Sequence, residues 1–244
     1  MNPEDIKNQI IQFIKQQTGH RPAVIGLSGG LDSSVVAYLA VEALGADKVY
    51  AVMSPSSTNT VQDLELAKRV TKYLNIQYSI SNIENIIKTF QNETKLFQNT
   101  KSLGNLKARI RMSLLYGKAN EIGGIVLGTG NKTELLTGYF TKYGDGGVDL
   151  LPIGDLYKTQ LRELAKFLSV PREIIDRAPT AGLWEGQTDE NEMGITYDEL
   201  DKILMAIERY GDLDRFDIDN VKKVKQMIQN AEHKLRTVPI CIIK

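Results

Sequence analysis

Cysteine is nearly absent from this sequence of 244 residues, which contains only Cys241. A single cysteine excludes an intramolecular disulfide framework and a metal cluster held by several cysteines. It is also typical of a reducing compartment, so we expect a cytoplasmic protein. The residue lies in the apolar segment 238–243, and we interpret it as part of an apolar tail. A catalytic thiol is the alternative that the count leaves open.

Net charge and long apolar runs are missing as well. The 30 basic residues balance 30 acidic residues, so no overall field attracts nucleic acid or an anionic membrane surface. No apolar run approaches the ~18 residues that a membrane-spanning helix needs, and the first residues carry no apolar signal-peptide core. We therefore expect neither nucleic acid nor a membrane as a partner, and any phosphate site must be built locally.

Short apolar runs alternate with helix-like stretches along the chain. The runs predict buried strands at 23–27, 49–53, 76–80 and 125–128. Apolar periodicity with polar caps and glycine stops predicts helices at 3–18, 35–44, 61–74, 83–97 (one or two helices), 106–121, 156–168, 197–210 and 218–232. Strands that alternate with helices pair in parallel, so the predicted fold is doubly wound α/β with helices on both faces of the sheet.

Two glycine-containing segments, 138–149 and 177–194, have no clear period and are predicted to be loops. The second is long for a compact domain, and such loops are usually lids, binding loops or disordered. No linker, internal repeat or low-complexity tract divides the chain. We therefore predict a single domain over residues 1–244.

The first predicted strand runs directly into a glycine turn, Ser28-Gly29-Gly30-Leu31-Asp32-Ser33-Ser34. A strand, a glycine turn and a helix together direct backbone N–H groups and a positive helix end toward an anion. The segment lacks the Lys-Ser/Thr ending of a Walker A loop and the three glycines of a dinucleotide fingerprint. Asp32 would repel a phosphate unless a cation such as Mg²⁺ lay between them. A helix-capping role for Asp32 is the alternative.

The segment 28–33 resembles the pyrophosphate loop of the ATP pyrophosphatases, which cleave ATP between its α- and β-phosphates. Later segments resemble the NAD synthetase family, in the same order and at similar spacing across about residues 22–240. These segments are 104–112, 128–134, 138–149, 151–158, 178–183 and 233–234. The resemblance implies the adenine-nucleotide α-hydrolase-like fold, with a mainly parallel five-stranded sheet. It also implies an AMP-forming ligase that uses ammonia to make NAD.

For ATP, the resemblance implies contacts from the phosphate loop and from three later residues. The set is Gly26, Leu27, Ser28, Gly29, Gly30, Leu31, Asp32, Ser33, Thr129, Lys158 and Thr180. Asp32 and Glu134 are the implied Mg²⁺ ligands, because the carboxyl ends of their strands can flank the point where the strand order reverses. Lys158 would neutralise charge on the departing pyrophosphate. From position alone, Lys158 also fits a solvated lysine in the first turn of a helix.

The second implied substrate is nicotinate adenine dinucleotide, or deamido-NAD, and the implied contacts are Arg109, Lys142, Asp149, His233 and Lys234. Its carboxylate would attack the α-phosphorus of ATP, and ammonia would then displace AMP from the acyl-adenylate. Asp145 is the candidate group for holding ammonium and removing a proton. Simpler interpretations remain for three of these features: a surface arginine for Arg109, a helix-dipole pair for His233 and Lys234, and a turn-forming aspartate for Asp145.

No segment resembles a glutaminase domain, so free ammonia is the expected nitrogen donor, and the resemblance implies a homodimer. The loop 54–60 departs from the family pattern, so it gives no expectation about ATP contacts. Two other functions remain open. One is another pyrophosphate-releasing amide ligase, similar to GMP synthetase, and the other is a nucleotide-binding module without catalysis. The pair of acids at 32 and 134 argues against the module.

Overall fold

The computed structural model describes residues 2–184 and 186–243, and a parallel sheet of four strands forms the centre of this part of the chain. The strands are β1 (Ala23–Gly26), β2 (Val49–Met53), β3 (Gln77–Ile80) and β4 (Ile125–Leu127), in the order β3-β2-β1-β4. The chain moves outward from β1 to β3 and then returns to place β4 on the other side of β1. The strand order therefore reverses between β1 and β4, and the predicted α/β fold is confirmed.

A complete fifth strand is not formed within the described residues. After β4 the chain runs beside the sheet again around the parallel bridge between Leu127 and Leu150. Pro152 follows two residues later, and it has no N–H to donate to a ladder. The chain then turns, with Gly154 N donating to Leu151 O at 3.1 Å. The strand count is thus one lower than the resemblance implies, and a single bridge stands in the place of the fifth strand.

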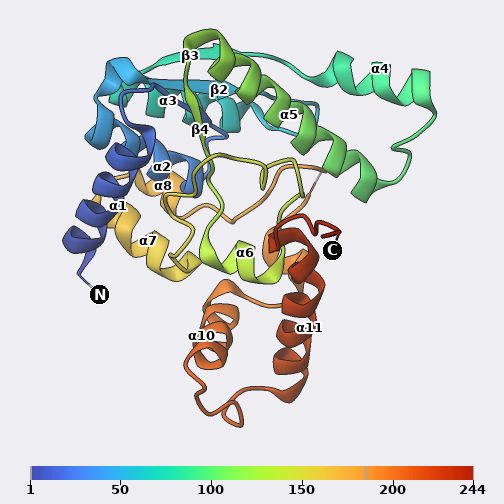
Figure 1. Cartoon of the computed structure of the whole chain (residues 1–244). Coiled ribbons are helices and arrows are strands. Elements are labelled where there is room, and N and C mark those ends of the chain that lie inside the picture. The colour runs from blue at the N-terminus through green and yellow to red at the C-terminus, as the bar shows by residue number, and fades with distance from the viewer. Residues whose placement is uncertain (1, 185, 244) are drawn as a thin grey trace.

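Helices cover both faces of the sheet (Figure 1). They are α1 (Pro3–Thr18), α2 (Leu31–Leu44), α3 (Val61–Leu74), α4 (Glu84–Thr94), α5 (Thr100–Ile122), α6 (Lys132–Thr137), α7 (Lys158–Phe167), α8 (Arg172–Ile175), α9 (Asp189–Met193), α10 (Tyr197–Glu208) and α11 (Ile218–Leu235), with a short 3₁₀ turn η1 (Ala46–Lys48).

Successive residues of β1 face opposite layers, as the period of a strand requires. Ile25 lies in the larger core with α1, α2 and α7, whereas Val24 packs in a second core with Met112 and Leu115 of α5. Gly26 faces the α5 layer too, where an added Cβ would lie 3.4 Å from Leu115. Burial on both faces explains why the strand is an uninterrupted apolar run.

Several helices begin where a side chain caps them. Asn2 caps α1 by accepting from Glu4 N at 3.1 Å, as predicted. Helix α5 begins at residue 100, six residues before the predicted start, because Asn99 accepts from Ser102 N at 2.9 Å. Helix α2 begins at residue 31 rather than 35, which places Asp32 in its first turn. Helix α9 lies inside the segment predicted as a loop at 177–194, of which Glu185 is outside the described residues.

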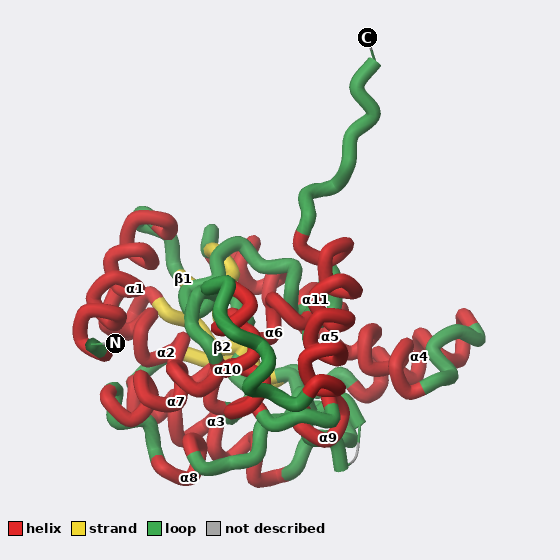
Figure 2. The backbone as a smooth tube through the Cα atoms, turned by 90° about the horizontal axis from the view of Figure 1, so that it is seen from below, coloured by secondary structure: helices red, strands yellow, loops and turns green. Residues whose placement is uncertain are grey.

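The C-terminal helices form a separate apolar cluster. Helices α10 and α11 pack around Tyr197 and Leu200, with Tyr157 closing the cluster toward α7. Figure 2 shows that α4 projects from the body and that the chain after α11 extends away from it, with Cys241 exposed in this tail. Within the described residues, no helix has the length and apolar character needed to cross a membrane.

Candidate active site

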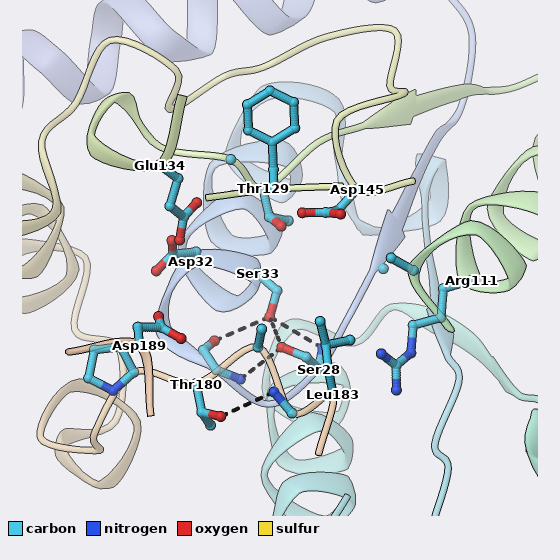
Figure 3. Close-up of a pocket in the computed structure, with 18 of the residues that line it drawn as sticks. Ser28, Asp32, Ser33, Arg111, Thr129, Glu134, Asp145, Thr180, Leu183 and Asp189 are labelled. Atoms are coloured by element: carbon cyan, nitrogen blue, oxygen red, sulfur yellow. Dashed lines mark hydrogen bonds between the residues drawn. The ribbon is translucent and has the colours of Figure 1, made fainter. Parts of the chain in front are cut away.

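A cavity of about 750 Å³ opens at the carboxyl ends of β1, β2 and β4. Its walls come from the glycine turn after β1, from α5, from the segment 138–145 and from the segment 178–184. This is the edge at which open parallel sheets bind ligands, next to the reversal of strand order. Figure 3 shows the residues that face this space, with Asp32 and Glu134 pointing toward one another.

The turn after β1 is held in shape by its own serines. Ser33 Oγ lies 3.1 Å from Ser28 Oγ and donates to Gly30 O at 3.2 Å, and Ser34 Oγ donates to Gly30 O at 2.7 Å. Gly30 is the N-cap of α2, and no side chain caps the helix. Asp32 therefore does not cap α2. The start of α2 lines the cavity, and the backbone N–H groups of a helix start are suited to bind an anion.

Gly29 has a positive φ of 82°, and a Cβ at this position would collide with the carbonyl oxygen of Asp63 in α3. We expect Gly29→Ala to lower the free energy of unfolding by about 1–3 kcal/mol, because both the backbone strain and the overlap are unfavourable. Gly30→Ala is the matched control, since its φ is −87° and its Cβ would meet only Ser28 Oγ at 3.3 Å. Thermal unfolding of both variants tests this prediction, and equal losses of stability in the two variants would contradict it.

Two acids from distant parts of the chain share one lysine. Lys158 Nζ lies 2.6 Å from Asp32 Oδ1 and 3.6 Å from Glu134 Oε1. Asn131, which is fully buried, donates to Asp32 Oδ2 at 2.7 Å and accepts from Glu134 N at 3.0 Å. When both acids are ionised, two carboxylates against one ammonium leave a net negative charge, so the site can take a further cation.

Burial and charge shift the pKa values of this group. Burial, together with repulsion from Asp32, raises the pKa of Glu134 well above its ordinary value. For Lys158, burial acts to lower the pKa, but the carboxylates of Asp32 and Glu134 outweigh it and raise the pKa above the ordinary value. Lys158 is only 4% exposed and stays charged. It is thus a buried cation of the site and not a solvated surface lysine.

Asp189 and two tyrosines form a further polar group near Lys158. Asp189, which is 4% exposed, accepts hydrogen bonds from Tyr197 Oη at 3.0 Å and from Tyr139 Oη at 3.2 Å. The ring of Tyr197 lies 5.2 Å from Lys158 Nζ, a cation–π distance. Tyr197 therefore links the Lys158 ammonium to the carboxylate of Asp189.

Asp145 lies in the cavity wall formed by the segment 138–149. It accepts from Thr141 N at 2.9 Å, and the charges of Lys234 and Arg111 act on it. Asp145 is exposed toward the cavity, and the protein atoms around its carboxyl group disfavour the charged form and so raise the pKa of Asp145 above its ordinary value. A raised pKa brings a carboxylate closer to the range useful for proton transfer.

The structure separates the remaining predicted residues into two groups. The ATP set lines the cavity except Gly29, which lies in the turn behind it, and Lys234 also lines the cavity. Arg109, Lys142, Asp149 and His233 do not line it. Arg109 donates to Lys142 O at 3.2 Å and Lys142 donates to His233 O at 2.6 Å, so three of them form one outer strip.

Asp149 does not belong to this strip. Its carboxylate accepts hydrogen bonds from Tyr116 Oη at 3.0 Å and from Val126 N at 2.8 Å. A smaller pocket contains His233, Lys234 and Lys101, and Lys101 and Lys234 also line the main cavity. The outer strip is therefore continuous with the main site through these two lysines.

Sequence reasoning missed several polar residues of the site, among them Asn131, Asp189, Lys107 and Arg111. Asn131, Lys107 and Arg111 lie inside the segments that carried the resemblance, but no single-residue signal distinguished them from surface residues. Burial lowers the pKa of Arg111 to about 10, and its guanidinium donates to Ser54 O at 3.0 Å and to Asn59 Oδ1 at 3.0 Å. Only the fold reveals that these side chains point inward.

The doubly wound sheet and the serine-glycine turn without a Walker lysine agree with the ATP pyrophosphatase class of nucleotide-binding enzymes, which segment 28–33 resembles. The NAD synthase family model matches residues 4–239. The chain belongs to the NAD synthase family.

Individual relatives agree with this assignment. The NH₃-dependent NAD⁺ synthetase of Archaeoglobus fulgidus is 47% identical over 248 residues, which cover 100% of this chain and 99% of the relative. Among solved structures, NMN synthetase from Francisella tularensis superposes with a TM-score of 0.91 at 35% identity and 100% coverage of both chains. The NH₃-dependent NAD synthetase from Campylobacter jejuni superposes with a TM-score of 0.86 at 32% identity, covering 99% of this chain and 100% of the other.

Proposed function

We propose that this protein makes NAD by ATP-dependent amidation of deamido-NAD with ammonia, releasing AMP and pyrophosphate. One observation carries the proposal within the family: Asp32 and Glu134 flank Lys158 beside an anion-binding glycine turn. A simple nucleotide sensor has no need for two acids around one buried lysine. The family and its full-length relatives support the same reaction.

The acid pair fits a magnesium ion that bridges to ATP. No group of three histidine, cysteine or acidic side chains in the described residues is arranged to hold a metal. Asp32 and Glu134 would therefore supply two ligands, and phosphate oxygens and waters the rest, which is the usual coordination of Mg²⁺. Burial first, and then repulsion from Asp32, raises the pKa of Glu134, and a divalent cation between the two carboxylates would relieve the repulsion. When bound, the ion would neutralise negative charge on the phosphates.

The first chemical step joins the nicotinate carboxylate to the α-phosphorus of ATP. A carboxylate oxygen forms the new P–O bond while the bond to the β-phosphate oxygen breaks, and pyrophosphate leaves with its electron pair. Backbone N–H groups of the glycine turn and the ammonium of Lys158 stabilise the growing charge. Asp32 and Glu134 hold Lys158 at this position in the absence of nucleotide.

The second step releases AMP. Ammonia attacks the acyl carbon of the adenylate, the C–O bond to the AMP phosphate breaks, and one proton leaves the nitrogen. Asp145, which lines the cavity and has a raised pKa, would hold ammonium and accept this proton. Arg109, Lys142, His233 and Lys234 would bind the phosphates of deamido-NAD, and Asp149 its ribose.

A mononucleotide acceptor is the second candidate, because a solved structure with a TM-score of 0.91 is named NMN synthetase. We expect the dinucleotide acid to exceed the mononucleotide acid in kcat/KM by at least ~10-fold, the effect of one additional charge-assisted phosphate contact. Purified protein with ATP, Mg²⁺ and ammonium, given either acceptor, tests this by chromatography of NAD, NMN and AMP. A preference for the mononucleotide would replace the proposed substrate. Pyrophosphate release without either product would point to another amide ligase.

We further propose a homodimer. Large apolar side chains are exposed on the projecting helix α4 and on the edge strand β3, including Phe90, Ile86, Tyr78 and Ile80, each at least 38% exposed. Monomeric proteins rarely leave such a group uncovered. Sedimentation equilibrium is expected to give twice the chain mass, and Phe90→Glu to shift the protein toward the monomer. A monomeric parent protein would refute the assignment.

A further inference from the structure

The segment 180–183, the strap, lines the cavity next to the glycine turn. It carries Thr180, a proposed ATP contact, and it ends at Leu183 (Figure 3). Gly182 N donates to Thr180 Oγ1 at 3.1 Å. With one lone pair of the hydroxyl used in this way, its proton remains free to be donated to a ligand.

Two side chains from other elements hold the strap by its carbonyl groups. Thr58 Oγ1 donates to Gly182 O at 2.8 Å, and Lys107 Nζ donates to Leu183 O at 2.8 Å. Lys107 also donates to Thr58 Oγ1 at 3.2 Å, which joins the two contacts. In the part of the chain that the structure describes, these are the hydrogen bonds that tie the strap carbonyls to α5 and to the loop after β2.

Lys107 is unusual for a lysine, because it is 3% exposed and forms no salt bridge within the described residues. Burial, reinforced by the neighbouring charge of Arg111, lowers its pKa, while Glu84 opposes the shift. Burying an ammonium costs several kcal/mol unless it is well bonded. A leucine or methionine would serve packing alone at less cost, so the ammonium indicates a role in the two bonds that it makes.

Both anchors of these bonds are themselves held by the fold. Lys107 lies in the first half of α5, and Ser57, beside Thr58, donates its N–H to Glu84 Oε2 at 2.9 Å. Gly104, one turn before Lys107, lets the strap approach α5: a Cβ there would lie 3.3 Å from Leu183 and 3.7 Å from the Trp184 ring. The loop 54–60, whose sequence departs from the family pattern, thus gains a role through Thr58.

We propose that Thr58 and Lys107 are positioning residues for ATP: they hold the strap so that the Thr180 hydroxyl meets the nucleotide. The inference rests on the proposed use of ATP. Neither residue contacts the reacting atoms, so their loss should weaken ATP binding more than it slows the bound complex.

Trp184 provides a direct readout, since it is the single tryptophan of the chain and follows the strap. We expect Lys107→Met to raise the KM for ATP ~10-fold, as expected for the loss of one charged hydrogen bond. The kcat and the KM for deamido-NAD should change far less, and acrylamide should quench Trp184 more strongly. Lys118→Met, on the same helix and paired with Glu121, is the matched control and should behave as the parent.

Thr58 gives an independent test that spares the buried charge. Thr58→Val should raise the KM for ATP, whereas Thr58→Ser, which keeps the hydroxyl, should restore it. In the double variant Lys107→Met, Thr58→Val, the two effects should combine to less than their product, because the residues share a bond. A purely structural role would lower the melting temperature without changing the KM for ATP, and this result would overturn the proposal. The proposal would also be overturned if Thr58→Ser did not restore the KM for ATP.

Binding of a non-hydrolysable ATP analogue, followed by Trp184 fluorescence, separates this inference from the proposed function. If the parent binds the analogue but makes no NAD, the reaction is wrong and the affinities of the variants still decide the role of Lys107. If the parent makes NAD and Lys107→Met binds the analogue within twofold of it, the positioning role alone is wrong.

Discussion

Asp32→Asn is expected to reduce pyrophosphate release at least ~10³-fold at saturating ATP. The substitution removes one of two carboxylates that face Lys158 and would leave the magnesium–phosphate complex with Glu134 as its only acidic ligand. The amide keeps the shape of the side chain, so the loss reports charge and not packing. Pyrophosphate and AMP, measured over a range of Mg²⁺ concentrations, provide the test.

Asp155→Asn is the control for that variant. Asp155 is also an acid paired with a lysine, Lys132, at 2.9 Å, but it is 96% exposed and does not line the cavity. Exposed pairs contribute little, so this variant should retain parental activity. If Asp32→Asn released pyrophosphate within tenfold of the parent at the same Mg²⁺ concentration, the acid pair would not hold the metal and the proposed mechanism would be wrong.

Asp145→Asn should form the acyl-adenylate normally and fail in the second step, with amidation by ammonia reduced about 10²–10⁴-fold. The side-chain amide of this variant would fill the same volume as the carboxylate but accept no proton. Single-turnover experiments that follow pyrophosphate and NAD separately distinguish the two steps. Hydroxylamine, a nucleophile that is largely unprotonated at neutral pH, should partly rescue product formation as the hydroxamate. Unchanged NAD formation with ammonia would remove Asp145 from the reaction.

The pH dependence of the parent follows from the same residue. Because its surroundings raise the pKa of Asp145, the amidation step should begin to fail on acidification at a higher pH than an exposed aspartate would require. In Asp145→Asn, the rate of amidation should not show this fall on acidification. The effect of pH on stability runs in the opposite direction. A carboxyl group whose pKa is higher in the folded than in the unfolded protein stabilises the fold fully at pH values below the unfolded pKa. It loses this contribution as the pH rises through the folded pKa. The asparagine variant should therefore be no less stable than the parent at neutral pH.

The local chemistry of the site could be predicted because it lies in contiguous residues. The apolar run 23–27 followed by serine and glycine predicted a strand, a turn and a helix, and the structure has β1, the turn and α2 there. The start of α2 was placed four residues late, since a helix N-cap made by Gly30 without a side-chain bond leaves no signal in the sequence. The expected fifth strand is reduced to a single bridge for a similarly local reason, because the chain turns around Pro152.

The residues that sequence reasoning overlooked all depend on contacts across the chain. Asn131 meets Asp32 from 99 positions away, and Lys107 meets Leu183 from 76. Periodicity describes which face of an element is apolar, but it does not reveal that a lysine in α5 points at the carbonyl groups of a distant strap. The long loop at 177–194 was recognised by its length, whereas its hydrogen bonds to Thr58 and Lys107 were not.

The sequence by itself determined the alternation of strands and helices, the phosphate loop and the family, because each is written in neighbouring residues or in ordered blocks. The tertiary structure decided which charges meet: Asp32 and Glu134 around Lys158, Asp145 open to the cavity, and Lys107 beneath the strap. Charges act through distance and burial, and both are set only when β1 and β4 lie side by side and α5 covers one face of the sheet.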